Sequence, residues 1–77
     1  MTTLILYTTA GCHLCGQAEA LLQQVALNYP LTITPTEIGD DDRLLDRYGV
    51  YIPVVKKQTG EELFWPFSLT DIKKFIR

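Results

Sequence analysis

Two cysteines lie close together near the N-terminus of this 77-residue chain, in the segment Gly11-Cys12-His13-Leu14-Cys15. On a helix, this spacing brings both side chains to nearly the same face, within reach of a disulfide after a small adjustment. A disulfide that closes so short a loop restrains the unfolded chain far less than a long-range bridge would. The spacing therefore indicates reactive thiols rather than a structural crosslink.

The segments on either side predict where the cysteine pair lies. Before it, the apolar run Leu4-Ile5-Leu6-Tyr7 is typical of a central strand that is covered on both faces. After it, apolar residues recur with the period of a helix that ends near residues 28–30. The apolar positions of this helix are Leu14, Ala18, Leu21, Leu22, Val25 and Ala26. The pair is therefore predicted at a strand-to-helix transition, a more specific signal than the spacing alone.

The start of a helix favours a thiolate, because the N–H groups of the first turn and the helix dipole stabilise an anion. Cys12 is predicted at this start, so we expect its thiol pKa to be lowered and its sulfur to be the attacking nucleophile. Cys15 lies one turn further in, is expected to be less exposed, and suits the resolving step. An imidazolium at His13 would favour the Cys12 thiolate, but His13 can equally be a solvated helix residue. The sequence leaves these two interpretations of His13 open.

The cysteine pair could instead bind a metal, as half of a four-ligand zinc site. His13 is the other obvious soft ligand and there is no second cysteine pair, so we do not expect a zinc site within one chain. Three non-enzymatic alternatives stay open: two chains that share zinc or an iron–sulfur cluster through Cys12, a redox-sensing domain, and a binding adaptor. The acidic run 40–42 is interpreted as a solvated loop and helix start, because adjacent side chains point in different directions.

A second strand is predicted to follow the first helix. Residues 31–38 alternate between apolar and polar side chains, and Pro35 cannot donate a ladder hydrogen bond. This strand is therefore expected at an edge of the sheet. Its core-facing positions are Leu31, Ile33 and Ile38.

Three further elements complete the predicted order. A short amphipathic helix follows the acidic run and closes at Gly49, with apolar positions at Leu44, Leu45 and Tyr48. Residues 52–55 and 63–65 are typical of an antiparallel hairpin. Ser68, with Asp71 three positions later, is a good N-cap for a final helix. A right-handed crossover joins the first two strands in parallel, so the sequence predicts an α/β fold with a four-stranded mixed sheet and three helices.

Length and composition narrow the class of protein. With 77 residues, 47% of them hydrophobic, the chain has room for one globular domain over residues 1–77. Its net charge of −2 and its scattered lysines and arginines do not provide the basic surface that nucleic acid requires. The N-terminus lacks the basic start of a signal peptide, and no apolar stretch is long enough to span a membrane. We therefore expect a soluble, cytoplasmic protein.

The chain resembles the glutaredoxin-like branch of the thioredoxin superfamily over essentially its whole length. The first strand, the segment 11–15, Tyr48-Gly49-Val50, the segment 51–55 and the last helix occur in the order of that family. The resemblance implies a thioredoxin-like fold of order βαβαββα and a thiol–disulfide oxidoreductase that acts on protein or glutathione mixed disulfides.

The resemblance also assigns Ile52 and Pro53. On its own, a proline at a strand start is expected in trans, since about 5–6% of X–Pro bonds in folded proteins are cis. The family implies that Pro53 is instead cis and faces the cysteines. It further implies that the backbone of Ile52 pairs with an extended stretch of substrate.

Three segments depart from the glutaredoxin pattern. Glutaredoxins usually have Pro-Tyr between the cysteines, a Thr two positions before the cis-proline, and Gly-Gly followed by an Asp that holds glutathione. Here the corresponding stretches are His13-Leu14, Tyr51 and residues 65–68. Bulky side chains thus stand where bare backbone normally meets glutathione. Trp65 is either a partner-binding aromatic or a half-buried cap on the core.

The resemblance sets the expected partners. We expect catalysis by Cys12 and Cys15, substrate contacts at His13, Ile52, Pro53 and Trp65, and a role in redox homeostasis and electron transfer. Protein disulfides are the expected substrates of a monomer that holds no tightly bound cofactor and no metal. Glutathione or a thioredoxin-type reductase is the expected reductant, and the sequence does not choose between them. The second cysteine argues against cluster sharing, which glutaredoxins generally perform without it.

Overall fold

The computed structural model describes residues 2–77, and residue 1 of the predicted domain lies outside that range. Its strands and helices are β1 (Thr2–Thr8), α1 (His13–Ala26), β2 (Leu31–Glu37), α2 (Asp42–Tyr48), β3 (Val54–Lys57), β4 (Glu62–Phe64) and α3 (Leu69–Phe75). This order, with three helices and one four-stranded mixed sheet, confirms the predicted fold class. No helix in the described part of the chain is long and apolar enough to cross a bilayer.

The strands lie in the order β2-β1-β3-β4. β1 pairs in parallel with β2 and antiparallel with β3, which in turn pairs antiparallel with β4. β2 is thus an edge strand, as Pro35 predicted, because proline leaves a gap in the donors of the ladder. The parallel register sets Thr8 opposite Glu37, so the carboxyl ends of β1 and β2 lie side by side.

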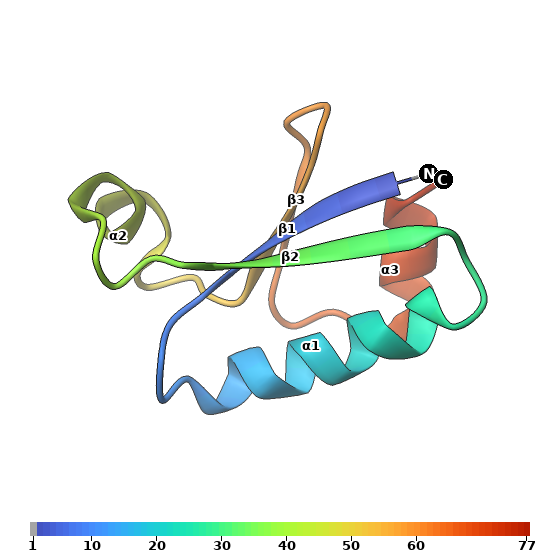
Figure 1. Ribbon diagram of the computed structural model, residues 1–77, viewed down its shortest axis with the longest axis horizontal. Coiled ribbons are helices and arrows are strands. Elements are labelled where there is room, and N and C mark those ends of the chain that lie inside the picture. The colour runs from blue at the N-terminus through green and yellow to red at the C-terminus, as the bar shows by residue number, and fades with distance from the viewer. Residues whose placement is uncertain (1) are drawn as a thin grey trace.

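Two helices cover one face of the sheet, and the third packs against the other face near one end of the strands. Figure 1 shows α1 and α3 together on one side, whereas α2 lies apart from them at the end of the strands from which the chain enters α1. The buried residues beneath α1 and α3 are Leu4, Leu6, Ala18, Leu22, Val25, Val55, Phe67 and Ile72. Those on the α2 side are Tyr7, Ile38, Tyr48 and Val54. Tyr7 and Tyr48 stack with ring centroids 4.2 Å apart, which fixes α2 against β1.

Two of the predicted apolar positions are exposed. Leu14 is 43% exposed, because the buried face of α1 begins at Cys15 and each residue turns the helix by about 100°. Leu45 is 40% exposed for the same reason, since Tyr48 is the buried residue of α2. Ile38 is fully buried, as predicted, and packs on the α2 side. Leu31 and Ile33 pack on the α1 side, because odd and even positions of an extended chain point to opposite faces.

Side chains cap the two shorter helices as predicted. The Asp41 carboxylate accepts hydrogen bonds from the N–H groups of Arg43 and Leu44, which places the acidic run at the start of α2. Ser68 and Asp71 form a reciprocal capping box at the start of α3. These caps satisfy N–H groups that a helix cannot pair internally.

Leu22→Ala should lower the free energy of unfolding by about 2–5 kcal/mol, because the fully buried Leu22 packs beneath the sheet and its loss leaves a cavity. Leu27→Ala, at the C-cap of the same helix, is the matched control, since Leu27 is 82% exposed. Leu27→Ala should change the free energy of unfolding by less than about 0.5 kcal/mol. Urea unfolding of both variants measures the difference, and equal losses would contradict this packing.

Candidate active site

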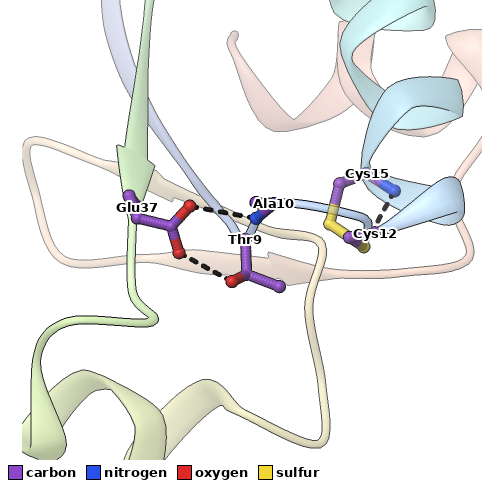
Figure 2. The surroundings of a disulfide bond; sticks show 5 residues. All are labelled: Thr9, Ala10, Cys12, Cys15 and Glu37. Carbon is purple, nitrogen blue, oxygen red and sulfur yellow. Dashed lines mark hydrogen bonds between the residues drawn. A yellow bond between two sulfur atoms is a disulfide. The ribbon is translucent and has the colours of Figure 1, made fainter.

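Cys12 and Cys15 form a disulfide at the N-terminus of α1, with their Cα atoms 5.3 Å apart. Cys12 is the N-cap residue, with extended backbone (φ −79°, ψ 105°), and Cys15 lies in the first turn. The N–H group of Cys15 donates a hydrogen bond of 3.2 Å to the sulfur of Cys12 (Figure 2). Cys12 is half-buried, and Cys15 is 4% exposed. The predicted difference in exposure between the two cysteines is therefore present.

The helix start is an environment that favours negative charge on the Cys12 sulfur. After reduction, the Cys15 N–H group can stabilise a thiolate at Cys12, as N–H groups do for other anions at N-caps. The first turn of α1 contains no acidic side chain that would oppose this charge. The arrangement can therefore support nucleophilic attack by Cys12 and internal displacement by Cys15.

A tight loop carries the chain from β1 into α1. Gly11 has φ +80°, a conformation in which a Cβ atom is strained. The N–H group of Cys12 donates to the carbonyl oxygen of Thr9 at 3.2 Å and closes the turn. Gly11 therefore allows Cys12 to reach the N-cap position directly after the strand.

Glu37, at the end of β2, binds this loop and was not predicted as a site residue. Its carboxylate accepts hydrogen bonds from the Thr9 hydroxyl (2.6 Å), the Ala10 N–H (3.0 Å) and the Gly39 N–H (2.7 Å). Figure 2 shows the carboxylate reaching across from β2 to the loop that leads to the cysteines. The Thr9 hydroxyl, followed by the Gly39 N–H, lowers the pKa of Glu37 below its ordinary value. The adjacent carboxyl ends of two parallel strands were the signal in the sequence that could have revealed this contact.

An open hollow of about 460 Å³ lies beside the disulfide. Its lining residues are Leu6, Thr8, Thr9, Gly11, Cys12, His13, Cys15, Gly16 and Glu19. The hollow brings His13 together with both cysteines, and it adds Glu19, which was not predicted as a site residue. Ile52, Pro53 and Trp65 are not among its lining residues.

Ile52 and Pro53 lie between α2 and β3. Their peptide bond is cis, as the family resemblance implied, and Pro53 is buried. Ile52 packs against the cluster around Tyr48 and donates its backbone N–H to the Tyr48 carbonyl oxygen at 3.0 Å. Contact of these residues with a substrate stays a prediction.

Trp65 is half-buried and packs on the α1 side of the sheet. Its ring meets Phe67 edge-to-face at 5.1 Å, and its backbone N–H donates to the Pro53 carbonyl oxygen at 3.2 Å. Trp65 therefore caps the core, as one of the two interpretations expected, and its role in binding a partner stays a prediction. The Trp65–Pro66 peptide bond is also cis, which was not predicted.

Within residues 2–77, no group of three or more His, Cys, Asp and Glu side chains is placed to hold a metal ion. The acidic run at residues 40–42 provides the N-cap of α2, through the Asp41 carboxylate. The chemistry that the described residues bring together is that of two thiols and their ionisable neighbours His13 and Glu19.

The sheet order, the covering helices and the disulfide at a helix start define a protein of thioredoxin-like fold with a Cys-x-x-Cys site. The family model described as Glutaredoxin-like domain (DUF836) matches residues 3–77. The chain belongs to this family. Family, fold and cysteine pair together indicate a redox function.

Solved structures support the same assignment. The X-ray structure of protein XcR50 from X. campestris has a TM-score of 0.83 and 35% sequence identity, covering 94% of this chain and 92% of that chain. Protein Ne2328 from Nitrosomonas europaea has a TM-score of 0.85 at 22% identity, covering 99% and 92%. A mutant thioredoxin from Halobacterium salinarum has a TM-score of 0.74 at 17% identity, covering 97% and 71%. The last two show likeness of fold alone. No curated protein matches the chain.

Iodoacetamide should modify Cys12 of the reduced, folded protein at neutral pH much faster than it modifies Cys15. Cys12 is half-buried at the helix start, whereas Cys15 is 4% exposed. Mass spectrometry with fragmentation of the peptide that carries both cysteines measures the two rates. The same protein unfolded in urea is the control and should lose the difference. Equal rates in the folded protein would contradict the assignment of Cys12 as the accessible thiol.

Glu37→Gln should flatten the pH dependence of stability in the acid range. Because the folded-state pKa of Glu37 lies below the ordinary value of 4.5, its ionised form stabilises the fold above that pH. This contribution is lost as pH falls through the lower folded-state pKa. The free energy of unfolding in urea, measured from neutral pH down into this range, should therefore fall less steeply in the variant. Asp71→Asn should act in the same direction, since Ser68 lowers the pKa of Asp71. An unchanged slope in Glu37→Gln would contradict the carboxylate contacts.

Proposed function

We propose that this protein is a thiol–disulfide oxidoreductase that works by a two-cysteine exchange cycle. One observation carries the proposal: the Cys12 sulfur stands at the N-cap of α1, accepts the Cys15 N–H at 3.2 Å, and is bonded to the Cys15 sulfur. Stabilisation of a thiolate and a partner within bonding distance are the two requirements of dithiol exchange.

The cycle begins with the reduced protein. The Cys12 thiolate attacks one sulfur of a substrate disulfide, and the other substrate sulfur leaves as a thiolate. Cys15 then loses its proton and attacks the Cys12 sulfur, which breaks the mixed disulfide and releases the second substrate thiolate. The Cys12–Cys15 disulfide forms, and two electrons have passed from the protein to the substrate. The low exposure of Cys15 supports this order, since an external disulfide reaches Cys12 first.

Protein disulfides are the proposed substrates. The open hollow beside Cys12 gives a bulky substrate access to the sulfur. The family resemblance supports contact of an extended substrate chain with the Ile52 backbone, whose N–H is bonded to the Tyr48 carbonyl oxygen. Trp65 is seated against the core and fills the stretch where bare backbone would contact glutathione, which weighs against a glutathione mixed disulfide as the main substrate.

Glutathione or a thioredoxin-type reductase is proposed to return the disulfide to the dithiol. We place the reaction in the cytoplasm, where thiols are kept reduced and a disulfide is usually transient. The chain is proposed to act there as a single-domain monomer without a tightly bound cofactor.

Cys12→Ser should abolish reductase activity toward a protein disulfide, because the remaining thiol, Cys15, is buried. Cys15→Ser should still attack and should accumulate a mixed disulfide that the missing resolving thiol cannot release. Turnover assays and mass spectrometry of the trapped complex measure the two outcomes. Undiminished turnover by Cys12→Ser would contradict the assignment of the nucleophile.

The same variants, assayed on a glutathione mixed disulfide, distinguish the substrate classes. Turnover of this substrate by Cys15→Ser would demonstrate a working glutathione site despite Trp65. Metal or colour bound to the purified protein, together with absence of turnover by the wild type, would favour the cluster-sharing alternative.

A further inference from the structure

We propose that Glu37 is a positioning residue for the nucleophile: its carboxylate holds the loop between β1 and α1 so that Cys12 stays at the N-cap, within reach of the Cys15 N–H. This inference rests on the proposed function of the cysteine pair. Glu37 lies 25 positions after Cys12 in the sequence, yet its side chain meets the loop that delivers the sulfur (Figure 2).

The carboxylate of Glu37 is itself fixed before it binds the loop. Its place follows directly from the strand register, which pairs Glu37 with Thr8 at the ends of β2 and β1. The Gly39 N–H donates to Oε2 at 2.7 Å and holds the side chain from its own side. The other two bonds, from the Thr9 hydroxyl to Oε2 and from the Ala10 N–H to Oε1, cross to the loop. The side chain therefore ties the loop to the segment that follows β2.

The loop has little other support. Ala10 and Gly11 are exposed, and a Cβ atom at Gly11 would meet nothing within 4 Å. Within residues 2–77, Glu37 is the residue whose side chain forms hydrogen bonds with Thr9 and Ala10. Backbone bonds hold the two ends of the loop, from the Ile38 N–H to the Thr8 carbonyl oxygen (2.9 Å) and from the Cys12 N–H to the Thr9 carbonyl oxygen (3.2 Å). Between these ends, the Glu37 carboxylate is the side chain that holds the loop in the described part of the chain.

The hydrogen bonds continue from the loop to the sulfur. Thr9, which Glu37 holds by its hydroxyl, accepts the N–H of Cys12 at its own carbonyl oxygen, at 3.2 Å. Cys12 in turn accepts the Cys15 N–H at its sulfur. A loop released from Glu37 would let Cys12 move away from the N–H group that stabilises its thiolate. Loss of that hydrogen bond would raise the pKa of the Cys12 thiol.

The charge of Glu37 has the opposite effect. A nearby carboxylate disfavours a thiolate, so removal of the charge alone would lower the pKa of the Cys12 thiol. The sign of the change in pKa therefore separates positioning from simple electrostatics. The other ionisable side chains that line the hollow with Cys12 are Cys15, His13 and Glu19, all from α1. None of these three residues is substituted in the variants below.

The test is a titration of the Cys12 thiol in the reduced protein, by thiolate absorbance and by the pH dependence of its alkylation. Glu37→Gln should raise the pKa of Cys12 by about half a unit, the share of a typical hydrogen bond. Alkylation at a pH below both pKa values should slow by about threefold, as half a pKa unit requires. Thr9→Val, which keeps the charge of Glu37 and removes one bond to it, should shift the pKa in the same direction by less.

Glu61→Gln is the matched control. It removes the same charge from the hairpin turn, where Glu61 contacts Thr59 and Lys57 and does not contact the loop. The Cys12 pKa should be unchanged in this variant. Should Glu37→Gln fail to fold, Thr9→Val carries the test with the carboxylate intact.

A fall or no change in the Cys12 pKa of Glu37→Gln would overturn the positioning role. No change in Thr9→Val would do the same. A wild-type Cys12 pKa near that of a free thiol, about 8.5, would instead overturn the proposed function itself. The titration needs no substrate, so the two failures are distinguishable.

Discussion

The hydrogen bond from the Cys15 N–H group to the Cys12 sulfur joins the chemistry of this chain to its fold, because an N–H group in the first turn of a helix has no partner within the helix. Cys12 keeps an extended backbone, and the helix starts at the next residue. The direction of that helix is set by Ala18, Leu22 and Val25, which are buried beneath the sheet. The hydrophobic core therefore determines which sulfur atom faces the N–H groups of the first turn.

The cysteine pair and the proposed substrate contact at Ile52 are supported by opposite faces of the sheet. The cluster beneath α1 and α3 holds the helix that carries the cysteine pair. The cluster around Tyr48 holds Ile52 through packing and through the Ile52 N–H group. Trp65 connects the two sides of the sheet, since its side chain packs on the α1 side and its backbone N–H group donates to the Pro53 carbonyl oxygen. A change in either core cluster can therefore reach the site without touching a sulfur atom.

Local patterns in the sequence predicted most of the fold and the cysteine pair. Pro35 marked an edge strand and Ser68 marked a helix start, because each effect arises within a few residues. The orientation of Leu14 could not be derived in this way, since it depends on where the buried face of α1 begins. The contact of Glu37 with the loop depends on the register of two strands far apart in sequence. The cis bond before Pro53 followed from family resemblance and not from the residue itself.

The burial of Cys15 determines how substrate and reductant can react in the proposed cycle. With 4% of Cys15 exposed, an external molecule that gives up or takes up electrons must do so at Cys12. Oxidised substrate and regenerating thiol would then compete for one atom and could not occupy the protein together. Turnover of this kind alternates between two half-reactions, which is the kinetic pattern called ping-pong. A single accessible sulfur thus sets the order of events as well as their chemistry.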